Sequence, residues 1–355
     1  MTLTGTPVRT GEPVSLWYRD PISCLQATLG SVVLNAGGDP LEVLGAHWEF
    51  RFRPGDVRPE EFYFPCAFDG DPARSIAPYH GLRSRWHTAA DRDRPLASLA
   101  AELAEGRLVL AGVDNYHLPF RPAYHDVHAA HLLVVYGVDE HAGTVWVSDA
   151  MPPAFQGPIA AEDFLRAWTS ANPDDEQDAF FSDAPLATRY LTVTVDTPLP
   201  ELDAAALARV LGNNVAGFTG VPPVGGAHPV TDESADWTGL AGLFRWLERT
   251  AEAAARGDGP ALRETYPLGW AMQAQACLHG EFLRAWGQRH GVPALREAGR
   301  RVEQVAHAWT GVRMTAAHGH GTPRTALPAL LRHGRRLERA YATAVEALDD
   351  ARKVL

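Results

Sequence analysis

The pattern of apolar residues changes near Pro198-Leu199-Pro200, and this change constrains the fold more than any other feature of the sequence. Before it, runs of alternating and β-branched residues, which indicate strands, are mixed with a few helical stretches. After it, apolar residues recur at helical spacing in stretches rich in Ala, Leu, Arg and Glu. The helices that we expect there span residues 201–212, 235–256, 268–290, 293–318 and 325–353. We therefore predict an α+β protein, with a mixed domain over residues 1–198 and an all-helical domain over residues 199–355.

The strongest strand signal in the mixed half is the segment AHLLVVYGVDEHAGTVWVSDA. Two apolar runs, Leu132 to Val138 and Thr144 to Ser148, flank the turn-forming sequence DEHAG, which is typical of an antiparallel hairpin. His131 enters the first strand and Asp149 leaves the second. The hairpin therefore places an imidazole and a carboxylate near the same end of a sheet.

A helix is expected directly after the N-terminal arm, in the segment CLQATLGSVVLNAGG, because its apolar residues recur at helical spacing. Asp20 is the expected N-cap and Pro21 the expected first helical residue, while Gly37 and Gly38 end the helix. Cys24 then lies in the first turn or two. A helix N-terminus and a nearby imidazolium both favour the thiolate form of cysteine.

Cys24, His131 and Asp149 follow one another in the order that a nucleophile, its base and an orienting carboxylate have in papain-like enzymes. We predict that they form a catalytic triad. Each residue also has a structural reading that stays open: free cysteine packs well in cores, a histidine at a strand entry is often structural, and an aspartate after a strand often caps a turn.

Four segments carry a resemblance to a known family: SCLQATLGSVVLNAGG, GRLVLAGVDNYHLPF, HAAHLLVVYGVDEHAGTVWVSDA and GPIAAEDFLRAW. Over roughly residues 15–195 the chain resembles the N-terminal domain of butirosin biosynthesis protein H and its relatives. It is more distantly similar to the bacteriocin-processing C39 peptidases, which share the papain-like plan. The resemblance implies a papain-like fold for the first half and an attached helical domain for the second.

The resemblance also implies a reaction, in which a cysteine accepts an acyl group from a carrier-protein thioester and passes it to an amine in natural-product assembly. Cys24 would be the acyl acceptor, His131 the general base and Asp149 the orienting carboxylate. The partners would be an acyl or peptidyl carrier protein with a phosphopantetheine-linked donor and a small-molecule amine, with no bound cofactor. The helical half would serve as a lid, or would bind the substrate or the partner. A peptidase or amidohydrolase with the same triad is one alternative, and a non-catalytic binding or scaffold protein of the same fold is another.

The chain departs from the papain-like pattern at the oxyanion hole, where the usual glutamine is replaced by Tyr18. A phenol can donate to an oxyanion, as can the backbone N–H of Cys24, so an altered hole is compatible with Tyr18. Gln26, which follows the cysteine, is expected on the helix surface.

Asp114, Asn115 and Tyr116 close the strand predicted before the hairpin. They either line the substrate cleft or form a turn whose polar groups are satisfied internally.

The segment HDVHAAH places three histidines, His125, His128 and His131, three residues apart, and imidazole is a common zinc ligand. Helical zinc motifs use a spacing of four with an adjacent carboxylate, whereas this segment runs into a strand. We expect no metal there. Cys66 and Cys277, the remaining cysteines, have neither CxxC spacing nor an evident base partner, so neither a zinc site nor a disulfide framework is indicated.

The net charge of -11 and the pI of about 5.7 argue against binding to nucleic acid or to an anionic membrane through a basic surface. The N-terminus lacks the features of a secretory signal, and the apolar runs are too short to span a membrane. We therefore expect a soluble protein of the cytoplasm. The sequence leaves the oligomeric state open, a homo-oligomer included.

Overall fold

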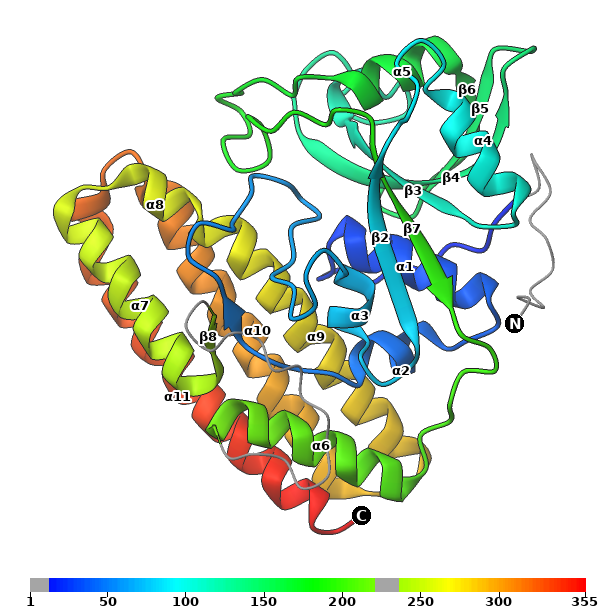
Figure 1. Ribbon diagram of the computed structural model, residues 1–355. Coiled ribbons are helices and arrows are strands. Elements are labelled where there is room, and N and C mark those ends of the chain that lie inside the picture. Colours follow the sequence, from blue (N-terminus) through cyan, green and yellow to red (C-terminus); the bar gives the residue numbers. More distant parts are fainter. Residues whose placement is uncertain (1–12, 221–235) are drawn as a thin grey trace.

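The structure is a computed structural model that describes residues 13–220 and 236–355. Its first half is built on a six-stranded sheet in which every neighbouring pair is antiparallel (Figure 1). In their order across the sheet the strands are β2 (Leu82–Thr88), β7 (Arg189–Val195), β3 (Val109–Asp114), β4 (Ala130–Asp139), β5 (Thr144–Asp149) and β6 (Phe155–Ala160).

The central strands β3 and β4 are buried on both faces because helices cover the sheet on each side. On one side lies α1 (Cys24–Asn35), which packs with Leu110, Leu132 and other residues of a large core. On the other side, α4 (Leu96–Ala104) and α5 (Ala161–Thr169) pack with Leu133 and its neighbours in a separate cluster. Successive residues of one strand thus enter opposite cores, which explains why these strands read as continuous apolar runs.

The predicted hairpin is confirmed as β4 and β5, with a β-bulge between Val135 and Gly137. The two edge strands, β2 and β6, were not predicted. β2 lies in a stretch where Pro, Arg and aromatic residues obscure any period, and β6 leads directly into the helix α5 (Ala161–Thr169). Edge strands need fewer apolar residues than central strands, so their sequence signal is weaker.

In the described residues of the second half the elements are helices, as predicted, apart from the two-residue strand β8 (Trp237–Thr238), which pairs with β1 (Arg51–Phe52). Its helices are α6 (Ala204–Thr219), α7 (Gly239–Arg256), α8 (Gly259–Arg263), α9 (Thr265–Arg289), α10 (Pro293–Gly319) and α11 (Pro323–Arg352). α10 contacts both α9 and α11 along its length, and α11 also contacts α6 and α7. The expected helix start at residue 235 lies outside the described residues. Among residues 13–220 and 236–355, none of the helices combines the length and the apolar character that crossing a bilayer requires.

The α+β fold class is confirmed, and the two halves share one hydrophobic core. The chain between α2 (Pro40–Gly45) and β1 enters the helical half, where the Trp48 ring stacks on Tyr341 at 5.3 Å between centroids. Phe50 stacks on Trp309 at 6.4 Å. The remaining short elements of the first half are α3 (Pro72–Ile76) and the 3-10 helix η1 (Asn115–His117). The division at residue 198 stays a prediction, since the packing continues across it.

Candidate active site

Cys24 is the first residue of α1, and the residue before it sets the helix start. Ser23 is the N-cap and forms a capping box with Gln26, whose Oε1 accepts a hydrogen bond from the Ser23 backbone N–H at 3.0 Å. The capping box satisfies backbone donors that a helix N-terminus leaves unpaired. The prediction of Asp20 as N-cap and Pro21 as first helical residue was therefore wrong. The surface position predicted for Gln26 was also wrong, because the residue is only 1% exposed.

His131 and Asp149 meet at the end of the hairpin, both buried. His131 Nε2 lies 2.9 Å from Asp149 Oδ2. Asp149 also accepts hydrogen bonds from Arg121 Nη1 at 3.2 Å and from the Met151 backbone N–H at 2.9 Å. Burial raises the pKa of Asp149, but the charge and hydrogen bond of His131, with Arg121, outweigh burial and hold that pKa below its ordinary value. The carboxylate is thus fixed in its ionised form beside the imidazole.

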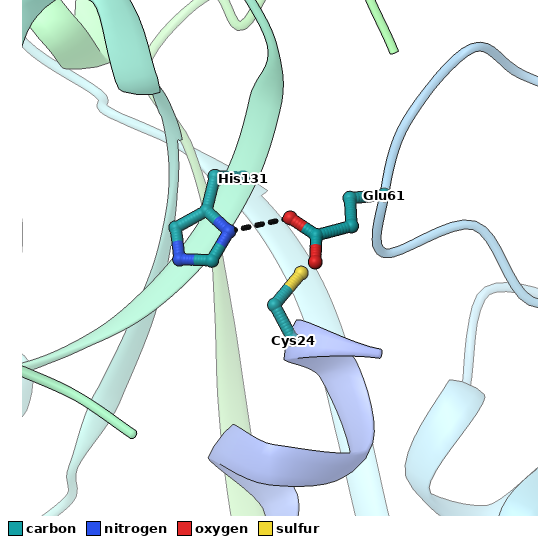
Figure 2. A group of neighbouring side chains, drawn as sticks. All are labelled: Cys24, Glu61 and His131. Atoms are coloured by element: carbon teal, nitrogen blue, oxygen red, sulfur yellow. Dashed lines mark hydrogen bonds and ion pairs between the residues drawn. The ribbon is translucent and has the colours of Figure 1, made fainter. Parts of the chain in front are cut away.

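The second ring nitrogen of His131 faces a residue that the sequence did not suggest. His131 Nδ1 lies 2.6 Å from Oε2 of Glu61, which comes from the irregular segment between β1 and α3 (Figure 2). The Glu61 backbone N–H donates to the carbonyl oxygen of Ala130 at 3.1 Å, which ties this segment to the start of β4. The Glu61 side chain is 12% exposed. Its partner is 70 residues away along the chain, so no local pattern could have revealed the contact.

The sulfur of Cys24 completes this group, since the ligand atoms of Cys24, Glu61 and His131 all lie within 4.8 Å of one another. Cys24 is fully buried, and burial together with the charge of Glu61 raises the pKa of its thiol to about 12 despite the opposing effect of His131. Burial lowers the pKa of His131, but the charges of Asp149 and Glu61 raise it well above its ordinary value. Both shifts favour a neutral thiol at Cys24 and an imidazolium at His131, whose two ring nitrogens face Glu61 and Asp149.

The donor set of this group is also one that can hold a metal ion, with a thiolate, an imidazole and a carboxylate as ligands. His131 would bind through Nδ1 while Asp149 held Nε2, an arrangement often seen at zinc sites. The histidine triplet considered from the spacing forms no such group within the described residues. Its members have separate surroundings: His128 Nδ1 lies 2.7 Å from Asp114 Oδ2, and His125 lies in a loop with a positive φ of 56°.

Tyr18 forms no hydrogen bond with Cys24 in the part of the chain that the structure describes. Its hydroxyl group lies 3.5 Å from the carbonyl oxygen of Asp20. Burial raises the pKa of Tyr18, with contributions from Asp20 and from the charge of Glu61. The role of Tyr18 at an oxyanion hole stays a prediction.

Asp114, Asn115 and Tyr116 lie beside the start of β4, where Asp114 pairs with Ala130 in the sheet register. The buried Asp114 carboxylate accepts hydrogen bonds from the Tyr116 backbone N–H at 3.0 Å and from Ser170 Oγ at 2.6 Å, besides its contact with His128. The Tyr116 ring stacks on His128 at 4.1 Å. These contacts satisfy the Asp114 carboxylate, whereas the buried Oδ1 of Asn115 has no hydrogen-bond partner among the described residues. Whether the three residues line the substrate cleft stays a prediction.

A comparison with protein families matches residues 23–150 to the family described as butirosin biosynthesis protein H, N-terminal. The match covers little more than a third of the chain, and it includes Cys24, Glu61, His131 and Asp149. It confirms the resemblance read from the sequence over this part of the chain. A search of curated proteins found no match.

Proposed function

We propose that this chain, whose residues 23–150 match the N-terminal family of butirosin biosynthesis protein H, is a biosynthetic acyltransferase that acts through a Cys24 thioester. It would move an acyl group from a phosphopantetheine thioester on an acyl or peptidyl carrier protein to a small-molecule amine. The product would be an amide of a natural product, and the reaction would take place in the cytoplasm.

The observation that carries the proposal is the assembly of Cys24, His131 and Asp149 from three separate elements. Cys24 stands at the N-terminus of α1, and its sulfur lies on the Nδ1 side of His131, while Asp149 holds Nε2 at 2.9 Å. A nucleophile, a proton carrier and an orienting carboxylate are the groups that acyl transfer through a covalent intermediate requires. A structural cysteine would need neither of the other two.

In the first step the Cys24 sulfur attacks the thioester carbonyl of the donor. His131 gives its Nδ1 proton to the departing thiol and takes the thiol proton of Cys24, so the Cys24 proton in effect leaves with the donor thiol and His131 ends with the protons it began with. The backbone N–H groups at the start of α1 are suited to stabilise the oxyanion of the tetrahedral intermediate. In the second step an amine attacks the acyl carbon and releases the Cys24 sulfur.

Transfer to an amine, rather than hydrolysis, requires that water is kept from the acyl-enzyme. The complete burial of Cys24 supports this, and it also means that the site must open to admit a donor. The helical half is suited to control that opening. The Phe181 carbonyl oxygen accepts from the Ala130 backbone N–H at 2.7 Å, and the neighbouring Phe180 stacks on Tyr266 of α9 at 4.4 Å. A movement of α9 would therefore reach the start of β4.

The test is to incubate the protein with acylated carrier proteins and to record its intact mass. We expect an acyl adduct that is lost in Cys24→Ala and kept in Cys66→Ala, the matched control for loss of a thiol. Release of the adduct by an added amine, with the amide as product, would complete the case. Cleavage of peptides without any adduct would favour a peptidase, and the absence of both activities would favour a scaffold protein.

A further inference from the structure

The contacts of His131 determine how many protons this site holds before the amine arrives. Both ring nitrogens of His131 face carboxylate oxygens, at 2.6 Å from Glu61 and at 2.9 Å from Asp149. Burial lowers the pKa of His131, but the charges of Asp149 and Glu61 raise it well above its ordinary value, so the ring is an imidazolium and each nitrogen carries a hydrogen. His131 is therefore saturated with protons and has no lone pair with which to accept another.

The two half-reactions of the proposed function differ in their proton balance. Acylation forms the Cys24 acyl bond and breaks the donor thioester, and the thiol proton of Cys24 ends on the departing thiol. Transfer to a cationic amine forms a C–N bond and breaks the C–S bond of the acyl-enzyme. The ammonium group loses two protons, of which Cys24 takes one back. The second proton needs an acceptor other than His131.

We propose that Glu61 binds the ammonium group of a cationic amine acceptor and takes its proton, which makes Glu61 a catalytic residue of the second half-reaction. This inference rests on the acyl transfer proposed above. The Glu61 carboxylate bonds to His131 through Oε2 and has an oxygen within 4.8 Å of the Cys24 sulfur, to which the acyl carbon would be attached (Figure 2). An amine that attacks this carbon comes within reach of the Glu61 carboxylate.

The charges around Glu61 favour a cation at this position. Among the described residues, Glu61 has no ion pair with any Lys or Arg, and His131 is its cationic partner. The adjacent Glu60, by contrast, already pairs with Arg58 and Arg189. The Asp178 carboxyl group, whose pKa is raised to about 6 by burial with a contribution from Glu61, adds to the acidic surroundings. A carboxylate without an Arg or Lys partner beside the nucleophile is suited to select a cationic amine over a neutral one.

The experiment separates the half-reactions in the full chain, with the butyryl thioester of N-acetylcysteamine as donor. Intact mass measures formation of the Cys24 adduct, and its decay is then followed with putrescine, a cationic amine, or with hydroxylamine, which is neutral near pH 7. We expect Glu61→Gln to form the adduct at least as fast as the wild type and to transfer to putrescine about 100-fold more slowly, the size of a general-base contribution. Its transfer to hydroxylamine should change only a few-fold, and Glu61→Asp should recover part of the loss.

Asp69→Asn is the matched control, because it removes one fully exposed carboxylate and should behave as the wild type. Transfer to putrescine at the wild-type rate in Glu61→Gln would overturn the proposal, as would an equal loss with both acceptors. Loss of transfer on adding a chelator, with recovery on adding zinc, would overturn it too, since the group would then be a metal centre. If the wild type forms no adduct with this donor or with acylated carrier proteins, the acyltransferase proposal itself fails and this inference falls with it.

Discussion

The two carboxylates that flank His131 come from different kinds of structure. Asp149 ends a strand of the β4–β5 hairpin and is fixed by Arg121 and by the Met151 backbone. Glu61 belongs to an irregular segment tied to β4 by one backbone hydrogen bond at its own N–H. The Asp149 carboxylate is held by Arg121 and a backbone N–H besides His131, whereas the Glu61 carboxylate has His131 as its one ion-pair partner among the described residues, although its neighbours Glu60 and Phe62 are buried. A fixed carboxylate is suited to orient an imidazole, and a less constrained one is suited to meet a substrate.

The largest effect that this comparison predicts is that of Asp149→Asn. Without the carboxylate, His131 loses the partner that sets its orientation and stabilises its charge, and we expect formation of the acyl adduct to slow about 1000-fold. The rate of mass gain with a thioester donor measures this. Glu140→Gln, which removes an exposed carboxylate in the turn of the same hairpin, should leave the rate unchanged. Equal rates for Asp149→Asn and the wild type would remove Asp149 from the mechanism.

The sequence revealed the residues of the hairpin but not Glu61, and the reason lies in the same structural difference. The hairpin was predicted because an alternating and β-branched pattern is local, and it placed His131 and Asp149 together. The contact of Glu61 with His131 spans 70 residues, and no period or motif marks it. The same holds for the pairing of β1 with β8, which joins residues far apart in the sequence.

The start of α1 is a different case, because its signal was present in the sequence and was assigned to the wrong residues. Ser23 and Gln26 have the spacing of a capping box, but the Asp20-Pro21 pair, a common helix start, lies only a few residues earlier. The sequence rules for helix N-termini were thus compatible with a start at Asp20 or at Ser23, and in the folded chain the capping box forms at Ser23.

Removal of the Glu61 carboxylate is expected to have a smaller effect, on the reactivity of the Cys24 thiol. The charge of Glu61 raises the pKa of Cys24, so Glu61→Gln should lower that pKa and increase the thiolate fraction at neutral pH. We expect alkylation of Cys24 by iodoacetamide to become about 10-fold faster, which corresponds to one pKa unit. Mass mapping of the peptide that contains Cys24 measures this, with Asp69→Asn as control. Slower alkylation in Glu61→Gln would show that Glu61 activates the thiol and does not restrain it.

The smallest effect is expected in the pH dependence of stability, and it compares the two carboxylates directly. The pKa of His131 is raised well above its ordinary value in the folded protein, so the folded state binds a proton there more tightly than the unfolded chain does. The stabilisation is complete below the pKa of an unfolded histidine, about 6.5, and is lost as the pH rises through the folded pKa. Asp149 acts in the opposite direction, since its pKa is lowered and its contribution is lost only in acid.

Removing either carboxylate should therefore lower the pKa of His131 and shift the alkaline loss of stability to lower pH. Asp149 is the larger of the two influences on His131, so the shift should be greater in Asp149→Asn than in Glu61→Gln. Urea unfolding of the wild type and both variants at several pH values from 6 to 10 gives the free energies of unfolding to compare. Other groups also titrate in this pH range, so the quantity to compare is the difference in free energy of unfolding between each variant and the wild type. A larger shift in Glu61→Gln would reverse the ranking, and it would identify the irregular segment, rather than the hairpin, as the principal support of the imidazolium.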